Sequence, residues 1–453
     1  MRSACFVACS VMLGGCAWTQ RTTTVSEPTP TALAALHSFL EREADVHGLP
    51  SIAVAVADRN RIIAGDAVGL ANRNENRRAD IDTYYRIGSV TKLFTGTLLL
   101  ILRDQGKLGL DDPVAKFVPE IEGVVHPAGD RTQITIRHLV THKSGLPRDL
   151  PASAEGKPGE PITDKKIVAA LHGQALVAVP GTTAIYSNQA MALVGVVLAR
   201  AAGRPFRQAM QENLLTPFDI KCVWDDKDVP REHLAEGYAL GSSDDKAGER
   251  SVGDGMESAG GLYCSARELA RFGQLFLHIK PDGDERTLKA TSRAEAMREH
   301  INWGCHEKKP TGMACGHNGL IDDYAASLHL FAVRGVVVVA LTNAAAIEAL
   351  ASLDRRIAAG LFVGTPWKRL ATPEVPVFPD EARAHYQAVL DGPATMKQLQ
   401  SHFVADQFNV VGGVAILANA AGGTGQWRAM QGQSSSRRGE GGPVGRHARL
   451  REG

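Results

Sequence analysis

Apolar residues near the start of the chain follow first the spacing of a helix and then that of strands. Residues 31–47 carry leucines and alanines on one stripe, which predicts a helix. Residues 52–57 are almost continuously apolar, and after a short polar turn residues 61–68 resume a strand pattern. These segments therefore predict a helix followed by a β-hairpin.

The strongest helical pattern in the chain runs from Ser89 to Gln105, with apolar residues facing one side. A long stretch rich in helices and loops follows, and its clearest helices are predicted at 190–202 and 266–278. Strand patterns then return near the other end. They are predicted at 313–316, 325–333 and 336–342.

Strands thus occur at both ends of this pattern, with helices between them. Short connections between neighbouring strands favour antiparallel pairing. The predicted fold class is α+β: one antiparallel β-sheet built from both chain ends and flanked by helices, plus a mostly helical lobe. A functional site is expected in the cleft between the sheet and this lobe.

The first residues have the pattern of an export signal. Arg2 precedes an apolar run of about ten residues, which is roughly half of what a membrane-spanning helix needs. The run ends at Cys16 in a sequence that resembles a bacterial lipoprotein signal, in which the cysteine becomes lipidated. We therefore expect export to the periplasmic face of a membrane, held there by a lipid anchor on Cys16. The alternative is an ordinary signal peptide that is cut nearby.

Composition changes divide the chain into five predicted parts. We expect a signal peptide over 1–16, a tether rich in Thr, Pro and Ser over 17–30, and the main domain over 31–365. A C-terminal extension with helical patterns is expected over 366–421. The Gly-, Ser- and Arg-rich segment 422–453 is expected to be disordered.

Net charge excludes one class of partner. The chain has 50 Lys and Arg against 49 Asp and Glu, a net charge of +1, so it has no basic field for nucleic acid. Four of its seven cysteines lie beyond the leader, at 222, 264, 305 and 315. Cys305 and Cys315 flank a short turn-like segment and are the most plausible disulfide pair; free thiols in the core are the alternative.

One histidine pair has the spacing of a zinc site but lacks its chemistry. His138 and His142 stand four residues apart in the segment HLVTH, as in zinc metalloproteases. Position 139 is leucine, however, so the glutamate that would activate water is missing. Helix packing is the favoured interpretation, and no metal ion or cofactor is expected.

The start of the strongest helix carries a candidate catalytic pair. Ser89 and Lys92 are three residues apart, so their side chains share one face of the helix. A serine hydroxyl becomes a good nucleophile when a neutral amine takes its proton, and burial favours the neutral amine. The Ser89 backbone N–H lies at the helix start, where it can stabilise a developing oxyanion.

Two later segments supply complementary groups. Tyr186 and Asn188 precede the helix predicted at 190–202, and a phenol can relay protons while an amide orients a lysine or a substrate carbonyl. The segment His317-Asn318-Gly319 follows a predicted strand. A strand edge there could pair with an extended substrate, and the next N–H, at Leu320, could be a second oxyanion donor.

The order S-x-x-K, Y-x-N, H-x-G resembles the serine β-lactamase and penicillin-binding-protein family, in particular its class C-like branch, in which a tyrosine leads the middle motif. Further segments are similar to recurrent parts of that family. They are ITIRHLVTHKSGLP at 134–147, GGLYCSARELARF at 260–272 and GHNG at 316–319. The resemblance spans about 49–343.

This resemblance implies roles for the candidate residues. Ser89 would be the nucleophile, Lys92 its general base or proton-relay partner, and Tyr186 a second acid–base group. Asn188 would orient the site, and His317 and Gly319 would lie on the substrate-binding strand. Ser89 and Leu320 would provide the two oxyanion N–H groups. Which of Lys92 and Tyr186 takes the proton stays open.

His317 departs from the pattern of β-lactamases, which carry Lys-Thr-Gly at this place. A cationic lysine grips a substrate carboxylate, whereas a histidine is mostly neutral at pH 7. Losing that charge-assisted bond weakens carboxylate recognition by on the order of 1.5–3 kcal/mol. The expected activity is that of a serine hydrolase acting on β-lactams, D-amino-acid peptides or small esters, with strong β-lactam hydrolysis disfavoured. The contrasting hypothesis is a catalytically weak module that binds peptidoglycan fragments or penicillin.

Overall fold

The computed structural model describes residues 27–151, 154, 162–240, 256–277, 288–308, 310–350 and 352–372. The predicted signal peptide with Cys16, the first part of the tether, and nearly all of the C-terminal extension and tail lie outside these residues. Within the described part, none of the helices combines the length and apolar character that crossing a bilayer requires.

A seven-stranded antiparallel sheet forms one half of the structure, and its order is β3-β2-β1-β9-β8-β7-β6. The first strands of the chain therefore pair directly with the last, which confirms the predicted sheet built from both chain ends. The strands are β1 (Ser51–Ala57), β2 (Ile62–Asn72), β3 (Arg77–Arg78), β6 (Gly304–Lys308), β7 (Gly312–Ile321), β8 (Tyr324–Phe331) and β9 (Val336–Thr342).

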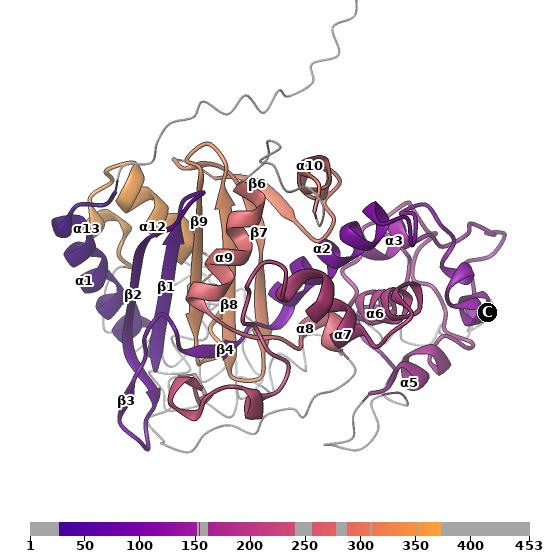
Figure 1. Ribbon diagram of the computed structural model, residues 1–453, viewed down its shortest axis with the longest axis horizontal. Coiled ribbons are helices and arrows are strands. Elements are labelled where there is room, and N and C mark those ends of the chain that lie inside the picture. Colours follow the sequence, from indigo (N-terminus) through magenta and orange to yellow (C-terminus); the bar gives the residue numbers. More distant parts are fainter. Residues whose placement is uncertain are drawn as a thin grey trace, which may run out of the picture.

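Helices cover both faces of this sheet because its central strands are apolar on both sides. Every residue of β1 and β9 is buried. Alternate residues contribute to two cores: Val54 and Val338 pack in the core that includes α1 and α12, whereas Ala55 and Val337 pack in the core that includes α9. These helices are α1 (Pro30–His47), α9 (Ala266–Leu277) and α12 (Leu353–Phe362) (Figure 1).

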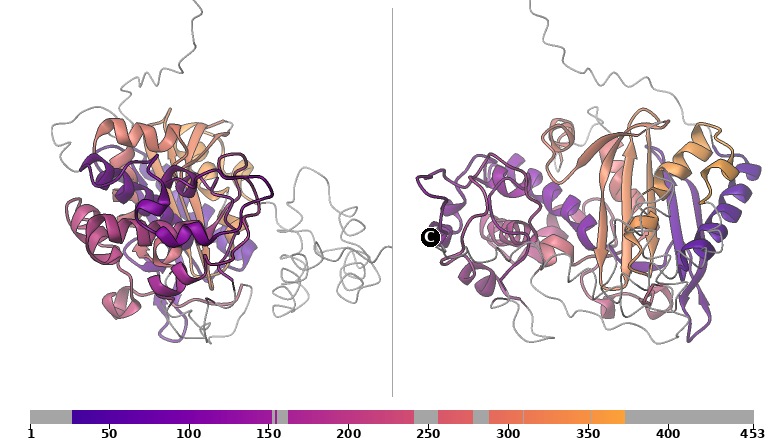
Figure 2. Two further views of the ribbon diagram at one scale, coloured as in Figure 1. Left: turned by 90° about the vertical axis from the view of Figure 1, so that its right-hand side faces the viewer. Right: turned by 180° about the vertical axis from the view of Figure 1, so that it is seen from behind.

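The predicted helical lobe lies beside the sheet, with α2 (Thr91–Asp104) between the two (Figure 1). Figure 2 shows the same arrangement from two further sides. The lobe contains α3 (Ile136–Val140), α5 (Asp164–Ala169), α6 (Asn188–Ala202) and α7 (Phe206–Met210). Further α-helices among the described residues are α8 (Glu257–Gly260), α10 (Ala290–Arg298), α11 (Ile347–Leu350) and α13 (Trp367–Leu370).

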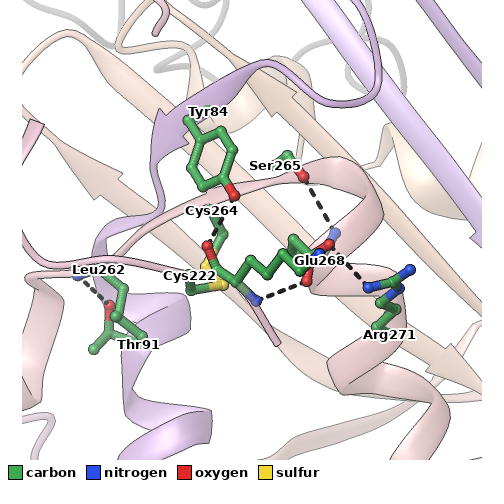
Figure 3. The surroundings of a disulfide bond; sticks show 9 residues. Tyr84, Thr91, Cys222, Leu262, Cys264, Ser265, Glu268 and Arg271 are labelled. Atoms are coloured by element: carbon green, nitrogen blue, oxygen red, sulfur yellow. Dashed lines mark hydrogen bonds and ion pairs between the residues drawn. A yellow bond between two sulfur atoms is a disulfide. The ribbon is translucent and has the colours of Figure 1, made fainter. Parts of the chain in front are cut away.

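A small second sheet, which the sequence pattern does not predict, supports the start of α2. Its strands are β4 (Tyr84–Arg86) and β5 (Tyr263–Ser265), paired antiparallel. Cys264 in β5 forms a disulfide with Cys222, and next to it the Leu262 N–H donates to the Thr91 hydroxyl oxygen at 3.3 Å (Figure 3). The disulfide therefore stabilises a segment that contacts the first turn of α2.

The second disulfide joins Cys305 on β6 to Cys315 on β7, which are directly opposite each other in the strand register. This confirms the pair predicted from the sequence. All four cysteines of the described residues are thus bonded, and the alternative of free core thiols does not hold in this structure.

The packed chain continues past residue 365, where the sequence predicts the main domain to end. Trp367 of α13 packs against Phe39 of α1, with ring centroids 5.0 Å apart. The Thr372 backbone N–H and hydroxyl donate to the buried carboxylate of Glu43 at 2.6 and 2.7 Å. Residues 366–372 therefore complete the face covered by α1 and α12.

Candidate active site

Ser89 lies in a short 3₁₀ turn, Gly88–Val90, that joins β4 to α2. Gly88 has a positive φ of 48°, and a Cβ at this position would lie 2.8 Å from the Leu320 backbone nitrogen of β7. Only glycine fits both the backbone conformation and this close approach. The turn therefore presents Ser89 against the edge of the large sheet, one step before α2 begins.

Lys92 is fully buried in the first turn of α2, and its ammonium group has three acceptors. Its Nζ donates to the Ser89 hydroxyl oxygen at 3.0 Å, to Asn188 Oδ1 at 2.8 Å and to the Ala259 carbonyl at 2.7 Å. A buried amine with these neighbours is held in one position within hydrogen-bonding reach of Ser89.

Tyr186 reaches the same hydroxyl from the helical lobe. Its Oη donates to Ser89 Oγ at 2.7 Å, from the loop that immediately precedes α6. Ser187 caps that helix by accepting the Ala190 N–H at 2.9 Å, which fixes the position of the loop. Lys92 and Tyr186 thus converge on Ser89 Oγ from the two sides of the cleft, as the sequence predicts.

Burial shifts the pKa values of Lys92 and Tyr186 in opposite directions. Burial, reinforced by the nearby charge of Arg148, lowers the pKa of Lys92 to about 7, although Asp149 partly opposes this. Burial raises the pKa of Tyr186 to about 12. Near pH 7 the lysine is therefore divided between its neutral and charged forms, while the tyrosine keeps its proton.

Strand β7 brings its backbone against the turn that holds Ser89. A Cβ on Gly319 would lie 1.9 Å from the Ile87 carbonyl oxygen and 3.1 Å from the Ser89 backbone nitrogen. A side chain at position 319 would therefore separate the strand from the turn. Because of this close approach, Leu320, the predicted second oxyanion donor, lies beside the turn that contains Ser89.

His317 also lies on β7, and its ring is 6.0 Å from the Tyr186 ring between centroids. Its Nδ1 donates to the Asn318 carbonyl at 2.5 Å, so the proton of the neutral imidazole resides on Nδ1. Desolvation, together with the charge of Lys92, lowers the pKa of His317 to about 3. The position that bears a lysine in β-lactamases is thus neutral here at physiological pH.

Two further residues lie next to Lys92 and Tyr186. Asn188 Nδ2 donates to Asp149 Oδ1 at 2.7 Å, so Asp149 fixes the orientation of the amide that faces Lys92. The guanidinium of Arg148 lies 5.3 Å from the centroid of the Tyr186 ring. The sequence pattern gave no signal for either residue, because both follow a recurrent segment without a motif of their own.

The two histidines with zinc-site spacing make different contacts in the structure. His138 completes a capping box with Thr135 at the start of α3. The His142 ring packs against the Tyr186 ring in a tilted arrangement, and its Nδ1 accepts the Ser187 N–H at 3.2 Å. The described residues contain no cluster of metal-ligating side chains. The interpretation as helix packing therefore fits His138 but misses the contact of His142 with the site.

Another serine, histidine and aspartate meet in the structure without forming a relay. Ser327 and Asp354 both contact the Nδ1 atom of His329. A catalytic histidine needs one nitrogen for its orienting carboxylate and the other for the nucleophile. This cluster instead joins β8 to α12.

A cavity of about 680 Å³ lies beside Tyr186. Its lining includes Tyr186, His142 and His317, together with Asn302, Trp303 and the first residues of β6. Its volume is typical of sites for small molecules or short peptides.

Known proteins resemble this chain in sequence. Residues 36–362 match the sequence profile of the Beta-lactamase family. The D-alanyl-D-alanine-carboxypeptidase/endopeptidase AmpH of Escherichia coli is 35% identical over 176 residues, which cover 38% of this chain and 45% of that protein. A beta-lactamase of Pseudomonas fluorescens is 30% identical over 218 residues, covering 46% and 55%. The chain therefore matches only about half the length of these curated relatives.

The fold also resembles solved structures. The crystal structure of a beta-lactamase/D-alanine carboxypeptidase from Yersinia pestis, complexed with citrate, superposes with a TM-score of 0.59. The match has 20% sequence identity and covers 73% of this chain and 98% of that one. This likeness supports the α+β fold assigned above.

Proposed function

The chain belongs to the β-lactamase family, and on that basis we propose that it is an exported serine hydrolase of the class C-like type, acting through an acyl-serine intermediate. The observation that carries this proposal is the pair of hydrogen bonds on Ser89 Oγ, from Lys92 at 3.0 Å and Tyr186 at 2.7 Å. An activated nucleophile needs a base within this reach.

Acylation would begin with neutral Lys92, which accepts the Ser89 hydroxyl proton as Oγ attacks the substrate carbonyl carbon. The backbone N–H groups of Ser89 and Leu320 would stabilise the resulting oxyanion. The bond to the leaving group then breaks as Tyr186 donates its proton to the leaving atom, and the proton on Lys92 restores the phenol. Because the pKa of Tyr186 is about 12, this phenol is a proton donor near pH 7 rather than the initial base.

Deacylation would reverse these transfers with water in place of the leaving group. Water attacks the ester carbonyl of acyl-Ser89 while neutral Lys92 takes its proton. The carbonyl–Oγ bond then breaks, and the protonated Lys92 returns that proton to Ser89 Oγ. A slow second step would give a covalent trap for penicillin, whereas a fast one gives a hydrolase.

The chemistry of His317 narrows the substrate class. A neutral imidazole at this place offers no charge-assisted bond to a carboxylate. The proposed substrates are therefore small esters, and D-amino-acid peptides whose binding needs no terminal carboxylate, ahead of anionic β-lactams. The two described disulfides fit an exported chain, since such bonds persist in oxidising compartments. Attachment through Cys16 is part of the proposal and rests on the leader sequence alone.

A substrate panel tests the proposal. Hydrolysis of nitrocefin, a D-Ala-D-Ala peptide and a p-nitrophenyl ester would be measured with the purified chain and with Ser89→Ala. We expect turnover of at least the ester, and its loss in the variant. Tight binding of peptidoglycan fragments without a burst or turnover of any acyl donor would instead support the binding-module hypothesis.

A further inference from the structure

A largely buried ion pair joins the strand before Ser89 to the turn after β7. Arg86 is the last residue of β4, and its Nη1 donates to Asp322 Oδ2 directly beyond β7. The Arg86 side chain is 3% exposed and that of Asp322 is 18% exposed, so water and salt screen this pair less than an ordinary surface pair. The guanidinium also lies 5.6 Å from the centroid of the Tyr263 ring on β5. It is therefore held between β5 and the turn after β7.

The two ends of this pair lie next to the two predicted oxyanion donors. Arg86 is three residues before Ser89, and Asp322 is two residues after Leu320. An oxyanion hole is effective when both of its N–H groups lie within about 2.7–3.1 Å of the oxygen that gains the charge. The two chain segments that carry these N–H groups must therefore keep a fixed separation.

The closest approach between these segments is a contact of backbone with backbone. A Cβ on Gly88 would lie 2.8 Å from the Leu320 nitrogen, and a Cβ on Gly319 would lie 1.9 Å from the Ile87 carbonyl oxygen. Glycines permit this approach, but they have no side chains that could pack and set the spacing of the two backbones. Contacts beside the glycines must therefore set it.

The Arg86–Asp322 pair is such a contact, and it acts where β7 ends. Ile321 and Tyr324 are opposite each other in the register of β7 with β8, so Asp322 and Asp323 form the turn between these strands. The φ of Asp322 is 46°, in the left-handed region that aspartate tolerates better than most residues. A charge-assisted hydrogen bond from Arg86 to this turn joins the end of β7 to the end of β4.

We propose that the Arg86–Asp322 pair is a positioning element of the oxyanion hole, which keeps the Leu320 N–H at the correct distance from the Ser89 N–H. Neither side chain takes part in bond breaking or proton transfer. Because the pair acts through the backbone of the two donors, its loss should weaken oxyanion stabilisation more than substrate binding. This role depends on the proposed hydrolase function, since only the reaction of Ser89 produces an oxyanion.

An ester and its thionoester measure the oxyanion hole separately from the rest of the site. Both carry the same acyl group and the same p-nitrophenyl leaving group, but sulfur replaces the carbonyl oxygen in the thionoester. Sulfur is larger and accepts hydrogen bonds more weakly, so the thionoester gains less from the two N–H groups. Each kcat/KM is divided by the hydroxide-catalysed rate constant of that substrate. The ratio of ester to thionoester then reports oxyanion stabilisation, and a smaller fraction of folded enzyme does not change it.

We expect the native ratio to be well above one and to fall by on the order of tenfold in Arg86→Met, which keeps a long side chain but removes the charge. Asp322→Gly removes the carboxylate, is compatible with the positive φ, and should lower the ratio similarly. Asp322→Asn keeps one acceptor oxygen and should retain most of the ratio. The double variant Arg86→Met/Asp322→Gly should lower it no further than either single change, because the two residues act as one unit.

Arg267→Met is the matched control. The Arg267 guanidinium donates to both carboxylate oxygens of Asp82, at 2.5 and 3.0 Å, and so joins the start of α9 to the loop before β4. This variant removes an ion pair beside β4 but leaves Arg86 and Asp322 in place. The ratio should therefore stay at its native value.

A ratio that is unchanged in Arg86→Met and Asp322→Gly would overturn the proposed role even if the overall rate fell, because the pair would then only stabilise the fold. An equal fall in Arg267→Met, additive effects in the double variant, or a native ratio near one would overturn it as well. If Arg86→Met does not fold, the two variants of the more exposed Asp322 give the answer. Absence of any Ser89-dependent ester hydrolysis in the native chain is a different result, because it would refute the proposed function itself.

Discussion

His142 contacts the Tyr186 segment in two ways. It accepts hydrogen bonds from the backbone N–H groups of the residues before and after Tyr186, and its ring packs against the Tyr186 ring. The His142 carbonyl accepts the Ile185 N–H at 2.7 Å, and its Nδ1 accepts the Ser187 N–H at 3.2 Å. The two rings lie 4.6 Å apart between centroids. Burial, with a contribution from the charge of Lys92, lowers the pKa of His142 to about 4, so the ring remains neutral and Nδ1 remains an acceptor at physiological pH.

This contact makes His142 a positioning residue for Tyr186. His142→Ala leaves the Ser187 N–H without its acceptor and removes the ring contact, so kcat for ester hydrolysis should fall about 10- to 100-fold with a smaller change in KM. His142→Asn offers an amide oxygen near the position of Nδ1 and should recover most of the loss. Equal loss in both variants, or a loss confined to KM, would contradict this role.

The pH dependence of kcat/KM should report Lys92. With a pKa of about 7, the neutral base becomes available as the pH rises, so the rate increases through an acid limb near pH 7 and then levels off. If Tyr186 were the initial base, the rate would instead keep rising toward pH 12. A pH profile from 5 to 10 with a neutral ester distinguishes the two.

Arg148 supplies a control for this assignment. Its charge lowers the pKa of Lys92, so Arg148→Met should move the acid limb to higher pH, by less than roughly one pH unit because Arg148 is largely exposed. Arg148→Lys keeps the charge and should leave the limb in place. A limb that does not respond to Arg148→Met, even at low ionic strength, would show that another group titrates.

The neutral imidazole at position 317 should set the preference against anionic substrates. His317→Lys restores a cation beside Tyr186, and the ratio of kcat/KM for an anionic β-lactam to that for a neutral ester should rise by about tenfold or more. His317→Gln, a neutral variant, should leave the ratio nearly unchanged. An unaltered ratio in His317→Lys would mean that residue 317 does not contact the substrate carboxylate.

The end of the folded domain can be located with two truncations. A chain ending at 365 lacks Trp367, which packs on Phe39, and the Thr372 donors to buried Glu43. It should lose at least about 2 kcal/mol of unfolding free energy relative to a chain ending at 372. Urea denaturation measures the difference. Equal stability of the two truncated chains would place the boundary at 365.

Acid should also destabilise the folded chain in a defined range. His142 and His317 have pKa values of about 4 and 3 in the folded state, below the usual 6.5. Between the folded-state pKa values and 6.5, the unfolded chain therefore binds more protons than the folded chain. Stability therefore falls as the pH drops from about 6.5 toward 4. His142→Asn should reduce this slope, and a slope unchanged by it would contradict the buried neutral state.

The sequence was sufficient for features whose signal is local and periodic. The alternation and continuous apolar runs of β1, β2, β8 and β9 locate the strands, and the pairing of β1 with β9 agrees with the predicted sheet built from both chain ends. Ser89 and Lys92 share one helix face, so their contact is also a local property. The approach of Tyr186 came from resemblance to a known family rather than from spacing.

Features that depend on contacts between distant segments were not predictable in this way. The strands β4 and β5 have three residues each, too few for a periodic signal, and they meet across a separation of more than 170 residues. Trp367 belongs to the domain because it contacts Phe39, which no local pattern indicates. His142 and Asn302 gain their positions only when the lobe and the sheet are brought together around the cavity.

The most direct test of the central claim is the mass of the protein during turnover. After rapid acid quenching of a reaction with an activated ester, intact-protein mass spectrometry should show one added acyl group. Peptide mapping should place it on Ser89, and Ser89→Ala should show none. An adduct that persists in Ser89→Ala, or that maps to another residue, would contradict an acyl-enzyme formed on the hydroxyl that Lys92 and Tyr186 share.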